Sequence, residues 1–290
     1  MKVLYIIGNG FDQAHEIASS YKDFKHWVKS QHNLRFDAEI AQIEYLFRDN
    51  GELWADFETN LGHYKIDIIA EQRFGILPFI IQEYGFDGDI KEQVFGNNMP
   101  YIESLTETLQ RIFRNWVYSL DTKKTPRYSF TKEAFFLSFN YTDTLERVYR
   151  IPDKNILHIH GSVLNKNENL IFGHNNYVDP LSVVIEGNDI RDNNERIDKI
   201  CEMNNLIKPC YNIIDKNISF FKNLARIKDV WVYGHSYNDI DLPYFRKIRQ
   251  SVSPSAIWHM SWHVDSDVNR LMSLKKVIDI NDNHLETFYS

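Results

Sequence analysis

The sequence is poor in cysteine, with two in 290 residues, and this scarcity excludes several classes of protein. Cys201 and Cys210 lie in a polar stretch with no CxxC pair and no histidine at ligand spacing. A structural zinc site needs a full set of such ligands, and a disulfide framework needs more thiols. We therefore expect neither a zinc module nor a disulfide-stapled fold.

Long apolar runs and basic runs are also missing. No segment approaches the ~20 apolar residues that a helix needs to span a bilayer. The first twelve residues contain one lysine and a short apolar run that ends at Gly8, so they predict a first strand rather than a signal peptide. The net charge of −7 and the lack of a basic run argue against a nucleic-acid binder. We expect a cytoplasmic protein for which membrane and nucleic acid are not the partners.

Apolar residues make up 43% of the chain, which is ample for a core, and many occur in runs of strand length. We predict strands at residues 2–7, 134–139, 155–159, 229–233, 256–262 and 276–280. Helical periodicity fills the long interval after the first run, as in Tyr21 to Ser30, where Phe24, Trp27 and Val28 share one face. The predicted class is α/β, with a mostly parallel sheet and helices on both faces.

The chain reads as one domain over residues 1–290, with a helical insertion at about 36–125 and a second helical segment at about 193–225. Within the insertion we expect helices at 38–47, 52–71 and 101–120, and a surface loop or lid from Tyr84 to Pro100. Pro209 is expected to kink or split the second segment, because proline removes a helix hydrogen bond and clashes with the preceding turn.

Glycine and polar residues follow four of the predicted strands. The first strand runs into Gly8-Asn9-Gly10, the next two deliver Asn140 and His160, and the fourth ends at Gly234 and Ser236. Because α/β sheets bind ligands at the carboxyl ends of their strands, we expect these residues to share one crevice. The pattern indicates a nucleotide site equipped for chemistry.

Several of these residues have two interpretations. The glycine turn either cradles a pyrophosphate before a helix N-terminus or is simply a tight turn. Asp12 and His15 either contact a ribose or cap that turn, and Asp239 or Asp241 either accepts from a ribose hydroxyl or caps a helix. His160, with an ordinary pKa near 6.5, is either a general base or a packed core histidine.

The motifs together resemble the AbiH-like family of bacterial abortive-infection proteins, within the wider sirtuin-like fold. The resemblance covers nearly the whole chain and is carried by IIGNGFD at residues 6–12, SYKDF at 20–24, WADFE at 54–58, SFNYTDTLE at 138–146, HIHG at 158–161, FGHN at 172–175 and YGHSYNDIDLPYF at 233–245.

The resemblance implies a Rossmann-like sheet that binds NAD or a related dinucleotide. In sirtuin-like proteins the glycine turn holds the pyrophosphate, a strand-end Asn lies at the nicotinamide ribose and a His before Gly acts as general base. These roles fall on Gly8 and Gly10, on Asn140 and on His160, with Gly234 and Ser236 at the adenosine. The cofactor-binding candidates are Gly8, Asn9, Gly10, Asp12, His15, Thr142, Asp143, Gly234, Ser236 and Asp239.

The chain departs from the pattern in three places. Thr142 stands where sirtuin-like proteins usually have an acid, with Asp143 one place later. Gln13-Ala14-His15-Glu16-Ile17 replaces the common Leu-Ala-His-Gly-Leu, and the four-cysteine zinc module of deacetylating sirtuins is absent. The last departure favours plain hydrolysis of NAD over protein deacylation.

We therefore expect a metal-independent NAD glycohydrolase of antiphage defence, with NAD as its substrate. Asn140 and His160 are the expected catalytic residues, and Asp56 or Glu58 is a candidate to approach from the insertion. Control by homo-oligomerisation, a regulatory partner or a phage trigger is expected, because free NAD hydrolysis is toxic. Two alternatives remain: a non-catalytic sensor of a nucleotide or ADP-ribose, which Thr142 favours, and a toxin acting on nucleic acid.

Overall fold

A computed structural model describes residues 2–31, 57–63, 105–131, 133–165 and 169–289. Contacts divide the chain into two compact units, each assembled from separate stretches of sequence. The sheet unit comprises Met1–Ser20, Val117–Ile171 and Pro209–Ser290, and the helical unit comprises Tyr21–Trp116 and Phe172–Lys208. The helix expected at 38–47, most of that at 52–71 and the loop at 84–100 lie outside the described residues.

The sheet unit contains six strands, all parallel, in the order β3-β2-β1-β4-β5-β6. Their bounds are Val3–Ile7 (β1), Phe135–Ser138 (β2), Ile156–His158 (β3), Asp229–Tyr233 (β4), Ile257–Trp262 (β5) and Leu285–Tyr289 (β6). This is the strand order of the doubly wound dinucleotide-binding fold. Strands are added outwards on one side of β1 up to β3 and then on its other side from β4, so the strand order reverses between β1 and β4. The α/β prediction and the Rossmann-like architecture are confirmed.

One predicted strand is wrong. Residues 276–280 form the end of helix α13 (Asp265–Val277) and the loop that follows it. Ile278 and Ile280 are buried there, so the apolar pattern reflects a helix end packed on the core rather than a strand. The sixth strand lies further on, at Leu285–Tyr289, where most side chains are exposed.

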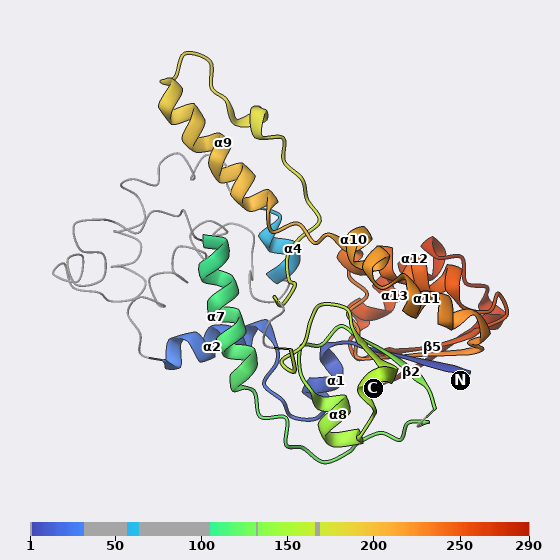
Figure 1. Ribbon diagram of the computed structural model, residues 1–290. Coiled ribbons are helices and arrows are strands. Elements are labelled where there is room, and N and C mark those ends of the chain that lie inside the picture. The colour runs from blue at the N-terminus through green and yellow to red at the C-terminus, as the bar shows by residue number, and fades with distance from the viewer. Residues whose placement is uncertain (1, 32–56, 64–104, 132, 166–168, 290) are drawn as a thin grey trace. The chain divides into compact units, whose positions relative to one another are not determined.

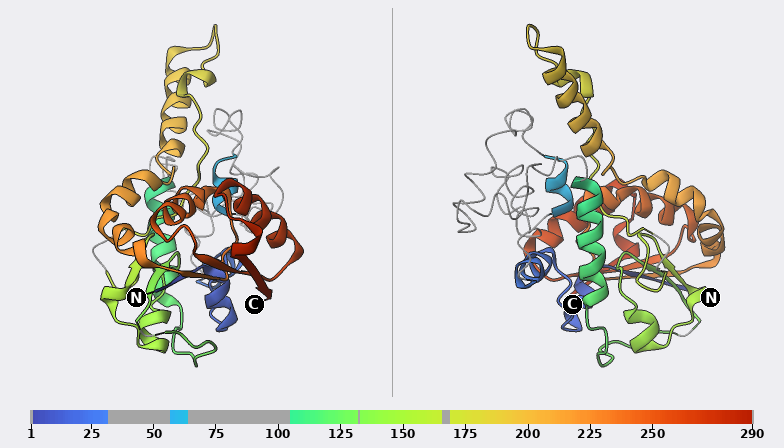
Figure 2. Two further views of the ribbon diagram at one scale, coloured as in Figure 1. Left: turned by 90° about the vertical axis from the view of Figure 1, so that its right-hand side faces the viewer. Right: turned by 60° about the vertical axis from the view of Figure 1, so that its left-hand side comes forward.

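Helices cover both faces of the sheet (Figure 1; Figure 2). Leu4 and Ile6 of β1 pack on one face with helices α10 (Cys210–Lys216), α11 (Ile218–Lys222), α12 (Leu242–Ser251) and α13. Tyr5 and Ile7 point to the other face, towards α1 (Asn9–Ala14) and α8 (Thr144–Tyr149). Side chains alternate along a strand, so the continuous apolar run of β1 reflects burial on both sides.

The helical unit holds α2 (Tyr21–Ser30), α4 (Phe57–Leu61), most of α7 (Leu105–Ser119) and α9 (Ile190–Asn204). Its core is aromatic: the Phe113 ring lies 4.6 Å from that of Phe172 and 5.6 Å from that of Phe24. The chain leaves α9 at Asn204 and starts α10 at Cys210, so the predicted break at Pro209 is confirmed.

Short 3-10 turns complete the described elements: η2 (Asp153–Asn155), η3 (Pro180–Val183), η4 (Asn223–Arg226), η5 (Asp239–Asp241) and η6 (Asp282–His284). Among the described helices, none combines the length and the apolar character that crossing a membrane requires.

Candidate functional site

Four of the sequence-predicted site residues lie just beyond the carboxyl ends of four neighbouring strands. Gly8 follows β1, Asn140 follows β2, His160 follows β3 and Gly234 follows β4. Because the strands are parallel and adjacent, all four residues lie along one edge of the sheet. The predicted common edge is therefore present, with the switch point between β1 and β4 within it.

Asn140 is held by its main chain, while its side chain is left without partners. Ser138 Oγ accepts from the main-chain N–H of Asn140 at 3.2 Å and lies 3.3 Å from its main-chain carbonyl oxygen. His158 Nδ1 lies 3.0 Å from the same carbonyl oxygen. The side chain is 5% exposed, yet neither of its amide atoms has a hydrogen-bond partner among the described residues. Such a buried, unsatisfied group costs about 1–3 kcal/mol.

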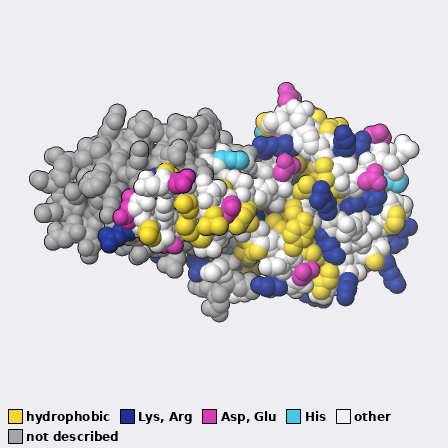
Figure 3. Space-filling model, turned by 90° about the horizontal axis from the view of Figure 1, so that it is seen from above, with side chains coloured by type: hydrophobic (Ala, Val, Ile, Leu, Met, Phe, Trp, Pro, Cys, Tyr) yellow, Lys and Arg dark blue, Asp and Glu magenta, His cyan; other side chains and the backbone are white. Residues whose placement is uncertain are grey.

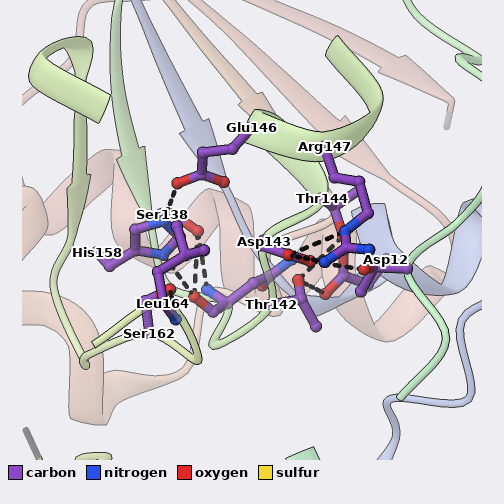
Figure 4. Close-up of polar contacts among 12 residues, drawn as sticks. Asp12, Ser138, Thr142, Asp143, Thr144, Glu146, Arg147, His158, Ser162 and Leu164 are labelled. Carbon is purple, nitrogen blue, oxygen red and sulfur yellow. Dashed lines mark hydrogen bonds and ion pairs between the residues drawn. The ribbon is translucent and has the colours of Figure 1, made fainter. Parts of the chain in front are cut away.

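His158 and Glu146 form a hydrogen-bonded pair (Figure 4), and His158 also contacts the main chain of Asn140. The Asn140 carbonyl can only accept, so His158 Nδ1 carries a proton, and His158 Nε2 lies 2.8 Å from Glu146 Oε1. Burial opposes the charged imidazole. The Glu146 carboxylate outweighs it, with help from the Asn140 carbonyl and Asp12, and raises the pKa of His158. Each ring nitrogen of His158 therefore faces an acceptor, and the residue fixes the main chain of Asn140.

Asp12 is buried on α1, beside the segment that follows β2. Thr142 donates to its Oδ2 at 2.6 Å and Thr144 donates to its Oδ1 at 2.8 Å, as Figure 4 shows. Burial raises the pKa of Asp12 to about 6, against the lowering effects of these two hydroxyls, of the nearby Asn140 amide and of His158. The Asn140 amide lies close enough to affect this pKa without reaching hydrogen-bond geometry.

This contact changes how Thr142 is understood. The sequence has threonine where sirtuin-like proteins usually have an acid, and the structure places the Asp12 carboxyl directly against the Thr142 hydroxyl. An acid from α1 therefore lies next to the position where the sequence lacks one. Asp143, the other candidate for that role, is occupied: Thr122 donates to one oxygen at 2.6 Å and Arg147 donates to the other at 2.8 Å.

The glycines of the first turn pack against the turn after β4. Gly10 N–H donates to the Gly234 carbonyl at 2.8 Å, and Gly234 has a φ of +62°. A Cβ atom on Gly8 would lie 2.6 Å from the Gly234 oxygen, and one on Gly234 would lie 2.2 Å from the Phe11 nitrogen. Glycine is required at these positions by the close approach of two main chains.

Two further cofactor-binding candidates make structural contacts. Asn9 donates to the Ser19 carbonyl at 2.9 Å and accepts from the Ser19 hydroxyl at 2.6 Å. His15 donates from Nδ1 to the Phe11 carbonyl at 2.7 Å and accepts at Nε2 from the Tyr149 hydroxyl at 2.6 Å. Burial, aided by the Arg127 charge and opposed by the Phe11 carbonyl, lowers the pKa of His15, which is consistent with a neutral ring.

His160 lies in a buried cluster that sequence reasoning did not foresee. Its Nε2 is 3.7 Å from Asp241 Oδ1, and His235 Nε2 is 3.4 Å from Asp241 Oδ2. The Tyr237 N–H donates to His235 Nδ1 at 2.9 Å, which leaves the His235 proton on the nitrogen that faces Asp241. His160 is 3% exposed and its ring meets those of Phe139 and Tyr244 edge-on. It is therefore both packed and next to an acid.

Of the remaining candidate site residues, two lie on the surface of the sheet unit and one lies in the helical unit. Ser236 and Asp239 are exposed on the turn after β4. In the helical unit, Glu58 accepts from the Lys208 ammonium at 2.8 Å and from the Gly173 N–H at 3.2 Å, whereas Asp56 lies outside the described residues. Among the residues described, no group of three or more potential ligands has the geometry to hold a metal ion.

The fold and the residues at the carboxyl edge of its sheet define a Rossmann-like α/β protein. Its candidate site lies at the ends of the central strands, is polar, and contains side-chain atoms without hydrogen-bond partners among the described residues. The family model for bacteriophage abortive infection AbiH matches residues 4–262, so the chain belongs to the AbiH family. Its role therefore lies in bacteriophage abortive infection. No curated protein and no solved structure shows significant similarity to the chain.

Proposed function

We propose that the chain hydrolyses NAD at the bond between nicotinamide and ribose, and that this activity underlies its role in abortive infection. The support lies in the strand order, in the Asn and His at the ends of β2 and β3, and in the sirtuin-like pattern of motifs. The observation that carries the proposal is the Asn140 amide, which is buried and unpartnered among the described residues while its main chain is fixed.

A dinucleotide would satisfy that amide. The Asn140 side chain has both a donor and an acceptor, which match a ribose hydroxyl or a water held in line with the anomeric carbon. The Asp12 carboxyl beside it, with its pKa raised to about 6, is mostly ionised at neutral pH. A carboxylate at this place stabilises the positive charge that develops on the ribose as the glycosidic bond breaks.

The reaction needs one water and one base. The bond from the ribose anomeric carbon to the nicotinamide nitrogen breaks, the electron pair leaves with nicotinamide, and the water oxygen bonds to the carbon. His160 accepts the proton that this water loses, and Asp241 at 3.7 Å stabilises the resulting imidazolium. The products are nicotinamide, ADP-ribose and a proton that His160 returns to solvent.

The test measures nicotinamide release from NAD by the purified wild type and by the purified variants Asn140→Asp and His160→Gln. These near-isosteric changes are needed because both side chains are buried, so that alanine would also leave a cavity. Loss of an oriented amide or of a general base lowers the rate by roughly 10²–10⁴-fold. Unchanged turnover in both variants would refute the proposal.

A second candidate is a sensor that binds NAD or ADP-ribose without cleaving it. The burial of His160 and its packing on Phe139 favour this alternative, because a packed ring has less access to water. Calorimetry with NAD and with ADP-ribose separates the two functions. Binding by the wild type that Asn140→Asp abolishes, with no nicotinamide released, would identify the sensor.

A further inference from the structure

The two units of the chain differ sharply in charge, which the net charge of −7 conceals. The sheet unit contains 19 Lys and Arg against 17 Asp and Glu, whereas the helical unit contains 14 against 23. The sheet unit is therefore slightly basic, and the acidity of the chain resides in the helical unit. A mean over the whole sequence says little about the surface of either unit.

Seven of the 19 basic residues of the sheet unit lie in one helical layer. Two segments, 216–228 and 242–251, together contain seven Lys and Arg and no Asp or Glu. They form α11, η4, α12 and the chain just beside them, and α12 contacts both α11 and η4. Figure 3 shows Lys and Arg spread over this side of the sheet unit. We call this surface the basic face; its cations are Lys216, Lys222, Arg226, Lys228, Arg246, Lys247 and Arg249.

A hollow of about 370 Å³ lies at the rim of the basic face, lined by Lys2, Ala225, Arg226, Lys228 and Ser253. Lys2 precedes β1 and Lys228 precedes β4, so the hollow lies at the amino ends of the strands, opposite the edge that holds Asn140. Main-chain hydrogen bonds fix its wall: Lys228 N–H donates to the Lys2 carbonyl at 2.8 Å, and Ser253 N–H donates to the Ile227 carbonyl at 3.0 Å.

The cations of the hollow are not neutralised by neighbours. Lys2, Arg226 and Lys228 are exposed, and none of them pairs with a carboxylate of the described residues. The nearest acid in sequence, Asp229, faces His259, whose Nε2 lies 3.9 Å from its Oδ1. Three unneutralised cations and a serine hydroxyl around one hollow match a phosphate group.

From this geometry we propose that the basic face binds the phosphodiester backbone of a nucleic acid, with one phosphate in the hollow. The cations extend beyond the hollow along η4 and α12, which is more than a single phosphate can contact but suits a regularly charged strand. Large apolar side chains of segments 216–228 and 242–251 are buried or half-buried, and a lipid surface would require exposed ones. The observations therefore favour nucleic acid over membrane.

The experiment measures fluorescence anisotropy of labelled duplex DNA and single-stranded RNA over a series of KCl concentrations. The variant Arg226→Gln/Lys228→Gln removes two cations of the hollow. Its matched control, Lys123→Gln/Lys154→Gln, removes two exposed cations of the same unit that lie outside the basic face. Each lost phosphate contact lowers the steepness of log K against log salt by about 1, so the hollow variant, which loses the one phosphate of the hollow, is expected to lose about 1 and the control none.

Thermal unfolding of both variants checks that the fold is intact, since all four side chains are exposed or half-buried. Salt-dependent binding that the hollow variant alone weakens supports the proposal. Absence of binding by the wild type, equal weakening by the control, or binding only to vesicles of anionic phospholipid would overturn it. Nicotinamide release is expected to be unchanged in the hollow variant, which keeps this result separate from the proposed hydrolysis.

Discussion

His158 donates a hydrogen bond from Nδ1 to the carbonyl oxygen of Asn140 at 3.0 Å. The bond crosses from the end of β3 to the end of β2 and fixes the main chain of the residue whose amide is unsatisfied. His158 itself is held by Glu146 through its other nitrogen. The candidate site therefore rests on a histidine that positions another residue and is not expected to touch the substrate.

The first prediction tests this positioning role. His158→Leu removes one of the two donors to the Asn140 carbonyl and leaves the buried Glu146 carboxylate without its histidine, so we expect a loss of about 3 kcal/mol of stability and a lower kcat for nicotinamide release. His158→Gln retains an N–H donor and should recover most of kcat. Denaturant unfolding and steady-state kinetics measure the two effects. Equal kcat in both variants would show that His158 serves stability alone.

The second prediction concerns pH. Asp12 has a pKa of about 6 in the folded protein against 3.8 as its ordinary value, so the folded state binds this proton more tightly than the unfolded chain. The free energy of unfolding therefore falls as the pH rises from about 4 to about 6, by roughly 3 kcal/mol from this group. The raised pKa of His158 acts in the same direction at higher pH.

Asp12→Asn should remove most of that fall between pH 4 and 6, because the amide keeps partners for Thr142 and Thr144 but does not titrate. Urea unfolding at a series of pH values gives the profile. Asp153→Asn, at an exposed position, is the control and should leave it unchanged. A profile of Asp12→Asn identical to that of the wild type would show that Asp12 does not titrate in this range.

The third prediction separates packing from ligand binding at the glycines. Alanine at Gly234 would place its Cβ 2.2 Å from the Phe11 nitrogen at a φ of +62°. We expect the cost to exceed clearly the ~1–2 kcal/mol of a left-handed alanine. Gly187 is the control, because its φ is +88° but nothing lies within 4 Å of its Cβ position. A Gly234→Ala protein that unfolds like the wild type but no longer binds NAD would assign the glycine to the ligand.

The fourth prediction is that nicotinamide release persists in chelator. Cleavage through an oxocarbenium-like state with an oriented water needs no Lewis acid. His158, two residues before His160, and His174 of the FGHN segment both have their two ring nitrogens in hydrogen bonds. Activity is measured before and after EDTA treatment, with Mg²⁺ and Zn²⁺ added back. Loss and recovery of activity would point to a metal site instead.

The sequence was most informative where burial is continuous. β1, β2 and β4 lie in the middle of the sheet, and their apolar runs predicted both their positions and the polar residues that end them. β6 was not predicted because it is an edge strand with mostly exposed side chains, and its sequence LETFY contains no continuous apolar run. Residues 276–280 were wrongly predicted as a strand because a helix end that packs on the core also buries alternate apolar residues, here Ile278 and Ile280.

Contacts between distant residues were the part of the site that the sequence could not provide. Asp12 and Thr142 are 130 positions apart, and nothing in either motif shows that the acid of one contacts the threonine of the other. Asp241 was expected at a ribose or a cap, and its place between His160 and His235 depends on how the turn after β4 folds back. The basic face was likewise hidden, because charge was averaged over units that differ.

The position of β1 in the sheet has a consequence for biosynthesis. β1 is translated first, yet its two neighbours are β2 at Phe135–Ser138 and β4 at Asp229–Tyr233. At about 5–20 residues per second, the ribosome needs roughly 10–45 s between the first strand and its last partner. A nascent chain interrupted before β4 lacks Gly234 and half of the switch point. Chains that stop before β4 should therefore be inert, and any toxicity should arise only after β4 has been synthesised.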